Sequence, residues 1–256
     1  MIGLVPRNKK YGWIPDLPDQ RDYSYVDLLA PSISPLPKII DLRPFCSPIE
    51  NQGDLGSCTA NALVGNLEYI KNKKIKKIIN FSRLFLYYNE RVLRNTVKVD
   101  SGASIRDGIK TLVKLGDCLE KLWPYNIKYF ANKPTLLAYQ NAEDYQIKNY
   151  YRIISTEEMR HTLSTGFPFV FGFAIYESFE TKTVAKTGNI PMPKPGEKLL
   201  GGHAVMAVGF DDSKKIFVIR NSWGEKWGDH GYFYLPYEYL SDSRLSSDFW
   251  TIRDMG

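Results

Sequence analysis

The sequence predicts an α+β fold with two lobes and a cleft between them. Helical periodicity dominates the chain from about residue 58 to residue 115, whereas continuous apolar runs, typical of buried strands, dominate from about residue 147 onward. Helices and strands that are segregated along a chain are typical of α+β proteins. We expect a helical lobe at about residues 48–138 and a β-rich lobe at about residues 139–250, both within a body of residues 38–256.

Residues 1–37 are predicted to form a leader ahead of this body. The segment is rich in proline and has no sustained helical period, which favours an extended conformation. Residues 12–23 also carry large apolar side chains that a disordered tail would not need, so we expect the leader to dock on the body. Residues 1–10 lack the apolar core of a secretory signal, and the longest apolar run, residues 167–176, is far short of the roughly 20 residues that span a membrane.

The first helix is expected to begin at Cys58, directly after the glycine-containing run of residues 52–57. Apolar residues recur at helical spacing from there, at Ala62, Leu63 and Leu67. A thiol in the first turn of a helix lies near unpaired backbone N–H groups and the positive end of the helix dipole, and both lower the pKa of the thiol. This segment therefore predicts a nucleophilic cysteine, although on its own it also fits a small buried residue.

Further elements follow from the same patterns. Residues 82–93 are predicted as a helix with Ser82 as its N-cap, and residues 105–115 as another. The charged run at residues 71–77 is expected to be a solvated loop or helix end. Three apolar runs are predicted as strands, at residues 167–176, 201–210 and 216–220.

Two of these strands carry polar residues that could form a catalytic site with Cys58. His203 stands near the head of one strand, and Asn221 directly follows the other. A cysteine, a histidine and an asparagine at the ends of successive elements are the parts of an activated thiol site, in which the imidazole takes the thiol proton and the asparagine orients the imidazole. The other two histidines, His161 and His230, lie in polar segments and are expected to be bystanders.

Three motifs resemble those of the papain-like, or cathepsin-like, cysteine peptidases. Gln-Gly-x-x-Gly-Ser-Cys at residues 52–58, His-Ala-Val-x-x-Val-Gly at residues 203–209 and Asn-Ser-Trp-Gly-x-x-Trp-Gly-x-x-Gly-Tyr at residues 221–232 occur in the order of that family. The separation of Cys58 from His203 lies within the roughly 130–150 positions typical of the family. The resemblance implies a helical lobe, an antiparallel β-barrel-like lobe and an active-site cleft between them.

The resemblance also implies a role for each catalytic residue. Cys58 would be the nucleophile, His203 the acid and base, and Asn221 the residue that orients the imidazole. Gln52 would donate a hydrogen bond to the developing oxyanion together with the backbone N–H of Cys58. Trp223 would shield the Asn221–His203 hydrogen bond from water.

Substrate contacts are implied in the same way. Gly102 matches a turn that lines the substrate groove, although the family's second glycine is Ser101 here. Gly201 lies near the pocket that sets specificity, Trp223 borders the groove, and Trp227 would edge the leaving-group side.

Composition narrows the classes of function. The net charge of +6 comes with no basic stripe alternating with aromatic residues, which argues against a nucleic-acid partner. Neither a metal nor an organic cofactor is implied, and no membrane partner is expected. The three cysteines, Cys46, Cys58 and Cys118, are expected to be free thiols, which favours an intracellular or reducing compartment.

We therefore predict a cysteine endopeptidase, a hydrolase that cleaves protein or peptide substrates through a thioester acyl-enzyme. Residues 1–37 would be a short propeptide if the protein is made as a latent zymogen, but the usual propeptide of the family is a longer, helical segment. Two alternatives remain: a non-catalytic peptide-binding module with the same fold, and a transpeptidase that passes the acyl group to an amine.

Overall fold

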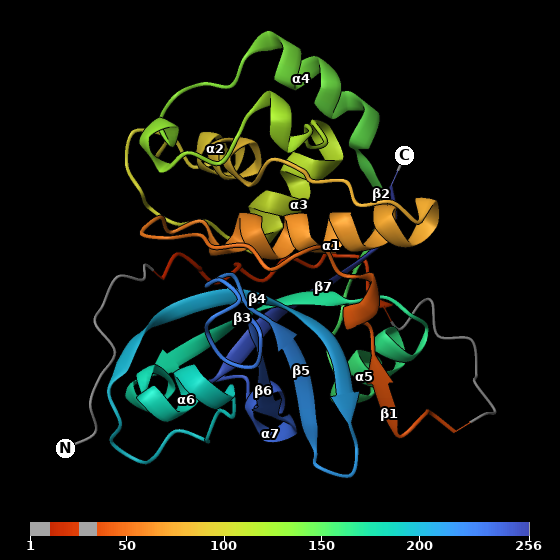
Figure 1. Ribbon diagram of the computed structural model, residues 1–256, viewed down its shortest axis with the longest axis vertical. Coiled ribbons are helices and arrows are strands. Elements are labelled where there is room, and N and C mark those ends of the chain that lie inside the picture. The colour runs from red at the N-terminus through yellow and green to blue at the C-terminus, as the bar shows by residue number, and fades with distance from the viewer. Residues whose placement is uncertain (1–10, 26–34, 256) are drawn as a thin grey trace.

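The computed structural model describes residues 11–25 and 35–255, and these residues form a helical layer above a layer of antiparallel strands (Figure 1). The remaining parts of the predicted leader, residues 1–10 and 26–34, lie outside the described residues. Within the described part of the chain, none of the helices combines the length and apolarity needed to span a membrane.

Four helices form the upper lobe of Figure 1: α1 (Cys58–Ile75), α2 (Arg83–Leu93), α3 (Ile105–Lys114) and α4 (Leu136–Ala142). The predicted cap of α2 is confirmed, since the Ser82 hydroxyl accepts a hydrogen bond from the Phe85 N–H at 3.1 Å. Ser104 caps α3 in the same way. The charged run at residues 71–77 covers the last turn of α1 and the residues that follow it, and residues 73–77 are exposed.

The strands form one antiparallel sheet, in the order β2-β7-β3-β4-β5-β6, with β1 paired to β4. Its strands are β1 (Ile39–Asp41), β2 (Ile147–Arg152), β3 (Phe169–Tyr176), β4 (Leu199–Asp211), β5 (Ile216–Arg220), β6 (Tyr232–Pro236) and β7 (Ser246–Met255). The α+β class is therefore confirmed, but the sheet is open. The expected barrel does not close because β2 and β6 stand at opposite ends of the strand order and do not pair.

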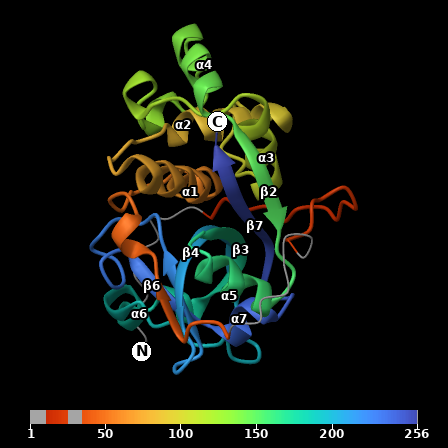
Figure 2. The same cartoon turned by 90° about the vertical axis from the view of Figure 1, so that its right-hand side faces the viewer.

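Three short helices, α5 (Thr156–Ser164), α6 (Lys182–Thr187) and α7 (Tyr237–Ser241), accompany the strands. The view turned by 90° shows that β2 and β7 continue from the sheet up the side of the helical lobe, beside α3 (Figure 2). The two lobes are thus joined by strands as well as by loops.

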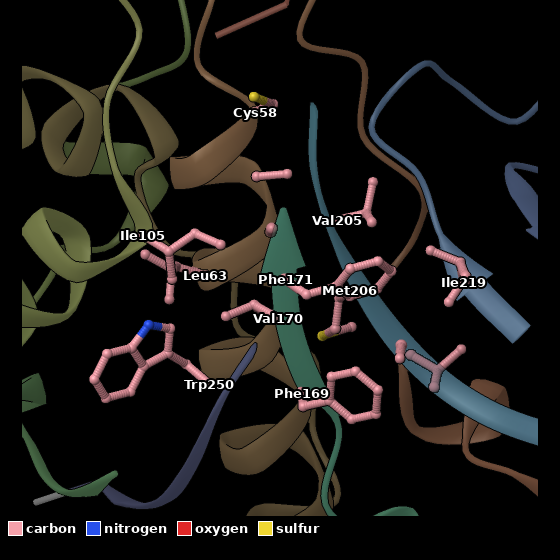
Figure 3. Close-up of a cluster of buried hydrophobic side chains, with 14 of the residues drawn as sticks. Cys58, Leu63, Ile105, Phe169, Val170, Phe171, Val205, Met206, Ile219 and Trp250 are labelled. Carbon is pink, nitrogen blue, oxygen red and sulfur yellow. The ribbon is translucent and has the colours of Figure 1, made fainter. Parts of the chain in front are cut away.

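The helical lobe and the sheet meet in a single apolar core. Leu63 of α1 and Ile105 of α3 face Phe171, Met206 and Trp250 of the sheet, and all five side chains are buried (Figure 3). Burial of a side chain of this size contributes about 1.5–3 kcal/mol to folding. This core fixes the first turn of α1, and with it Cys58, against strand β4.

Leader residues 11–25 run along the boundary between the two lobes (Figure 1). Trp13 forms a parallel β-bridge with Ala103, and Ser24 forms another with Arg152. The expectation that the leader docks on the body is therefore confirmed for its described residues.

Candidate active site

Cys58 begins α1 and lies at the lobe boundary with its side chain completely buried. The backbone N–H groups of Ala204 on β4 and of Gly12 in the leader face its sulfur. The sequence predicted a lowered thiol pKa, but here burial raises the pKa of Cys58 to about 11, and these N–H groups offset the effect only in part. The prediction is wrong for this covered form, because it considered the helix terminus and not the leader that excludes water from it.

His203 and Asn221 lie side by side in the sheet lobe. The His203 Nε2 atom is 2.9 Å from the Asn221 Oδ1 atom, and both residues are buried. Asn221 Oδ1 also accepts a hydrogen bond from the Ser222 N–H at 2.9 Å, which orients the amide with its oxygen toward the imidazole. An oxygen acceptor at Nε2 assigns the ring proton to Nε2, so Nδ1 is the nitrogen that can exchange a proton with a thiol.

Strand β4 brings this pair to the nucleophile. Because the Ala204 N–H faces the Cys58 sulfur, the adjacent His203 lies at the same end of α1. The three residues, far apart in the sequence, therefore converge where the first turn of α1 meets β4 and the end of β5.

Trp223 covers the histidine. Its ring stacks on the imidazole of His203 with the centroids 4.8 Å apart and the planes inclined by 27°. Trp227 packs edge-on against Trp223 at 5.0 Å. A buried indole on this face excludes water from the His203–Asn221 hydrogen bond.

Gln52 is hydrogen-bonded both to the turn that precedes Cys58 and to the loop that follows Asn221. Its Nε2 donates to the carbonyl of Leu55 at 2.9 Å, and its Oε1 accepts from the Ser222 hydroxyl at 2.6 Å. Its backbone N–H also donates to the Ser222 carbonyl, at 2.9 Å. These contacts fix the amide group in the loop that leads to Cys58.

The leader occupies the groove beside Cys58. The Ala103 N–H donates to the Gly12 carbonyl at 2.8 Å, and the Ile14 N–H donates to the Ala103 carbonyl at 2.9 Å. On the opposite wall, the Trp13 N–H donates to the Gly202 carbonyl at 3.2 Å. The leader is thus hydrogen-bonded to both lobes in the place where an extended peptide would lie.

Both glycines predicted to contact substrate lie against this segment. A Cβ atom on Gly102 would come within 2.1 Å of the Gly12 carbonyl oxygen, and Gly102 also has a φ of +72° that disfavours other residues. A Cβ atom on Gly201 would lie 2.9 Å from the Tyr11 side chain. The absence of a side chain lets the leader backbone approach closely at Gly102 and lets the Tyr11 side chain pack closely at Gly201.

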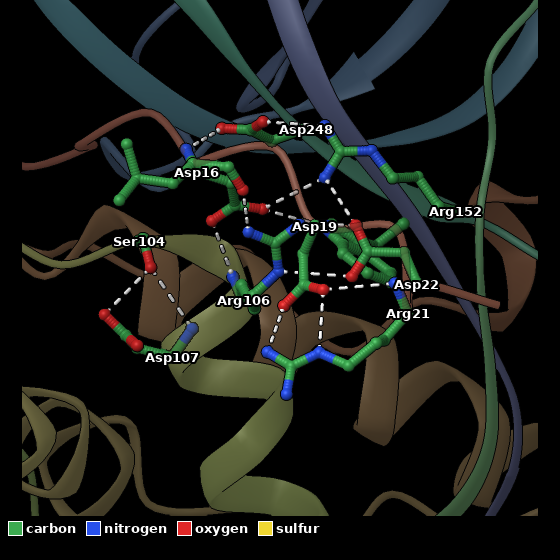
Figure 4. Close-up of polar contacts among 11 residues, drawn as sticks. Asp16, Asp19, Arg21, Asp22, Ser104, Arg106, Asp107, Arg152 and Asp248 are labelled. Atoms are coloured by element: carbon green, nitrogen blue, oxygen red, sulfur yellow. Dashed lines mark hydrogen bonds and ion pairs between the residues drawn. The ribbon is translucent and has the colours of Figure 1, made fainter.

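A cluster of charges anchors the next part of the leader (Figure 4). Asp22 forms an ion pair with Arg106 at the start of α3, and Arg152 at the end of β2 lies 3.4 Å from Asp22 and 3.5 Å from Asp16. Arg152 also pairs with Asp248 at 3.1 Å. Sequence reasoning missed this cluster because its members come from four distant segments and share no motif.

The two histidines predicted as bystanders lie outside this arrangement. His161 is on α5, where its Nδ1 lies 2.9 Å from the leader's Tyr25 hydroxyl. His230 lies in an exposed turn. In the described ranges, no group of three or more histidine, cysteine or acidic side chains could hold a metal ion, and all three cysteines are free.

Comparison with known proteins identifies the family. The model of the papain family of cysteine proteases matches residues 36–248. The chain belongs to the papain family. This papain-family chain is 41% identical to an uncharacterised peptidase C1-like protein of Acanthamoeba polyphaga mimivirus, over 97% of this chain and 88% of that protein.

Solved structures agree with this assignment. The crystal structure of xylellain, a cysteine protease from Xylella fastidiosa, is 42% identical, covers 98% of this chain and 99% of its own, and has a TM-score of 0.88. Digestive procathepsin L 3 of Tenebrio molitor, at 17% identity, shows the same fold with a TM-score of 0.69, over 93% of this chain and 75% of its own. The prediction of a papain-like cysteine peptidase is confirmed.

Proposed function

We propose that this papain-family protein is a cysteine endopeptidase whose described form is latent, with residues 11–25 lying in its substrate groove. The observation that supports this most is the position of Gly12. Its backbone N–H faces the sulfur of Cys58 while its carbonyl accepts a hydrogen bond from Ala103. A peptide therefore already occupies the space that a substrate needs.

In the open enzyme, His203 accepts the thiol proton at Nδ1 and the Cys58 sulfur attacks the carbonyl carbon of the scissile bond. The resulting oxyanion accepts hydrogen bonds from the Gln52 side chain and the Cys58 N–H. Collapse of this intermediate forms the thioester and releases the amine, which takes its proton from His203. Water then attacks the thioester and gives its proton to His203, which returns it to sulfur as the carboxylic acid leaves.

The leader is held in a way that prevents its own cleavage. The group it presents to Cys58 is an amide N–H, whereas attack requires a carbonyl carbon. The raised pKa of the thiol, about 11, keeps the sulfur protonated at neutral pH, so the nucleophile is also unreactive. Both effects depend on the leader remaining in the groove.

A substitution in the leader tests the proposal on the full chain. A Cβ atom on Gly12 would lie 1.8 Å from the Gly56 carbonyl oxygen, so Gly12→Val cannot keep the leader in place. We expect Gly12→Val to cleave a fluorogenic peptide library faster than the unmodified chain, and Cys58→Ala in that background to abolish cleavage. Leu17→Ala is the matched control, since the Leu17 side chain is exposed and its loss should change nothing.

The possible results separate the parts of the proposal. Absence of cleavage by the Gly12→Val chain, despite a native circular dichroism spectrum, would refute the peptidase assignment. Equal rates for Gly12→Val and the unmodified chain would refute latency while leaving the peptidase intact.

A further inference from the structure

We propose that Asp248 is a specificity-determining residue that makes the groove select a tryptophan side chain in its substrates. This inference rests on the proposed peptidase function and deepens it. It starts from the pocket beside Cys58 that the leader fills with the indole of Trp13.

The pocket is shaped for a flat ring because two glycines form its walls. A Cβ atom on Gly172 of β3 would come within 1.9 Å of the Trp13 ring, and one on Gly202 of β4 within 2.6 Å. These glycines lie on neighbouring strands, where Gly172 pairs with Ala204 and Gly202 with Ala174. The pocket therefore accommodates the full width of an indole only because neither strand carries a side chain there.

The pocket also holds a hydrogen-bond acceptor. The indole Nε1 of Trp13 donates to Asp248 Oδ2 at 3.1 Å, and the Asp248 residue is only 2% exposed. Its other oxygen, Oδ1, accepts from Arg152 at 3.1 Å. A buried carboxylate held from behind by an arginine favours a ring with an N–H at its edge over a purely apolar ring.

A bulge in strand β7 orients Asp248 toward this pocket. Between the pairs Val170–Trp250 and Gly172–Ser247, β3 advances by two residues and β7 by three, so β7 carries a bulge that includes Asp248. Asp248 also has a φ of +59°, in the left-handed region that non-glycine residues rarely adopt. Such conformations cost energy and are concentrated at binding sites, which fits a residue positioned for recognition.

The pocket serves one particular substrate position. Tyr11 contacts Trp223, which packs on Trp227, and Gly12 lies at the sulfur. The resemblance to papain-like peptidases implies that Trp227 edges the leaving-group side. Trp13 therefore lies on the acyl side, one residue from the reacting position. The walls belong to the body and not to the leader, so they remain for a substrate whichever way its backbone runs.

The test uses the full chain with Gly12→Val and Trp13→Ala, which displace the leader and remove its indole. Fluorogenic peptides that differ only at the residue before the reacting one should show kcat/KM for tryptophan about 10- to 100-fold above that for phenylalanine, with arginine below tryptophan. Any leader that still competes affects all substrates equally and leaves these ratios unchanged.

Two substitutions at Asp248 isolate the carboxylate, and both residues introduced tolerate a positive φ. Asp248→Asn should reduce the tryptophan-to-phenylalanine ratio, and Asp248→Gly should bring it to about 1, mainly through KM for tryptophan. Gly172→Ala tests the width of the pocket instead of its carboxylate. It should exclude tryptophan, while peptides with alanine before the reacting residue are still cleaved. An unchanged ratio in Asp248→Gly, or a preference for phenylalanine or arginine over tryptophan before substitution, would overturn the proposal.

A binding measurement keeps this proposal separate from the peptidase assignment. In full-length Cys58→Ala carrying the same two leader substitutions, blocked peptides with tryptophan should bind more tightly than those with phenylalanine, by calorimetry. Tight tryptophan binding without cleavage by the Cys58-containing chain would refute the peptidase and retain the pocket. Cleavage without a preference for tryptophan would refute the proposed pocket and retain the peptidase.

Discussion

Asp16 offers the sharpest test of how the leader is held. Its side chain is completely buried, and its carboxylate accepts hydrogen bonds from the Arg106 backbone N–H at 3.1 Å and from the Trp250 Nε1 at 3.0 Å. The Arg106 N–H belongs to the first turn of α3, where a negative charge is favoured by the helix dipole. We call the form with the leader in the groove closed and the form without it open. We predict that Asp16→Ala destabilises the closed form relative to the open form.

The size of the effect follows from these contacts. Each hydrogen bond to a charged group contributes about 1.5 kcal/mol or more, which gives roughly 3 kcal/mol for the two. Repulsion between the Asp16 and Asp248 carboxylates reduces this gain. The pKa of Asp248 is raised mainly by burial and next by the negative charge of Asp16. A net loss of about 2 kcal/mol would increase the population of the open form roughly 10- to 100-fold.

Alkylation of Cys58 by iodoacetamide, followed by mass spectrometry, measures that population, because the buried thiol reacts only after opening. Asp19→Ala is the matched control: Asp19 pairs with the exposed Arg21, and such surface pairs contribute about 0–1 kcal/mol. We expect Asp16→Ala to react at least tenfold faster than the unmodified chain and Asp19→Ala to stay within about fivefold. Equal rates for the two variants would refute the assignment of Asp16 as an anchor.

Two further predictions concern residues of the body. In the Gly12→Val chain, Gln52→Ala should lower kcat about 10²- to 10³-fold with little change in KM, measured by steady-state hydrolysis; a loss confined to KM would argue against an oxyanion role. Burial raises the pKa of Glu68 to about 7 from an ordinary value of 4.5, so the folded state binds the extra proton between these values and loses stability as pH rises through them. Denaturant unfolding should therefore show Glu68→Gln gaining stability relative to the unmodified chain from pH 4.5 to pH 7, and a constant difference would contradict the shift.

The sequence predicted most of the fold because its signals are local. The apolar run at residues 216–220 is β5, and Ser82 caps α2 as expected. The open sheet was not predictable in this way, since closure depends on whether strands distant in sequence, β2 and β6, come together. Strand pairing of this kind is set by tertiary packing, which no short pattern contains.

The residues of the site also differ in whether a local sequence signal predicts them. Cys58, His203, Asn221 and Gln52 lie in motifs whose resemblance to those of papain-like peptidases implied their roles. Asp248 has no motif around it, and its place in the Trp13 pocket depends on a bulge and on a leader that arrives from the other end of the chain. The raised pKa of Cys58 was missed for the same reason, because it follows from what covers the thiol.

The charge cluster on the leader has a consequence for the uncovered enzyme. While the leader is bound, Asp16 and Asp22 neutralise much of the positive charge of Arg106 and Arg152. Once the leader departs, Arg152 keeps Asp248 as an ion-pair partner but loses Asp16 and Asp22, and Arg106 loses Asp22. The vacated acyl end of the groove would then attract polypeptides with acidic residues upstream of the scissile bond, and added salt would weaken that attraction over distances beyond about 10 Å.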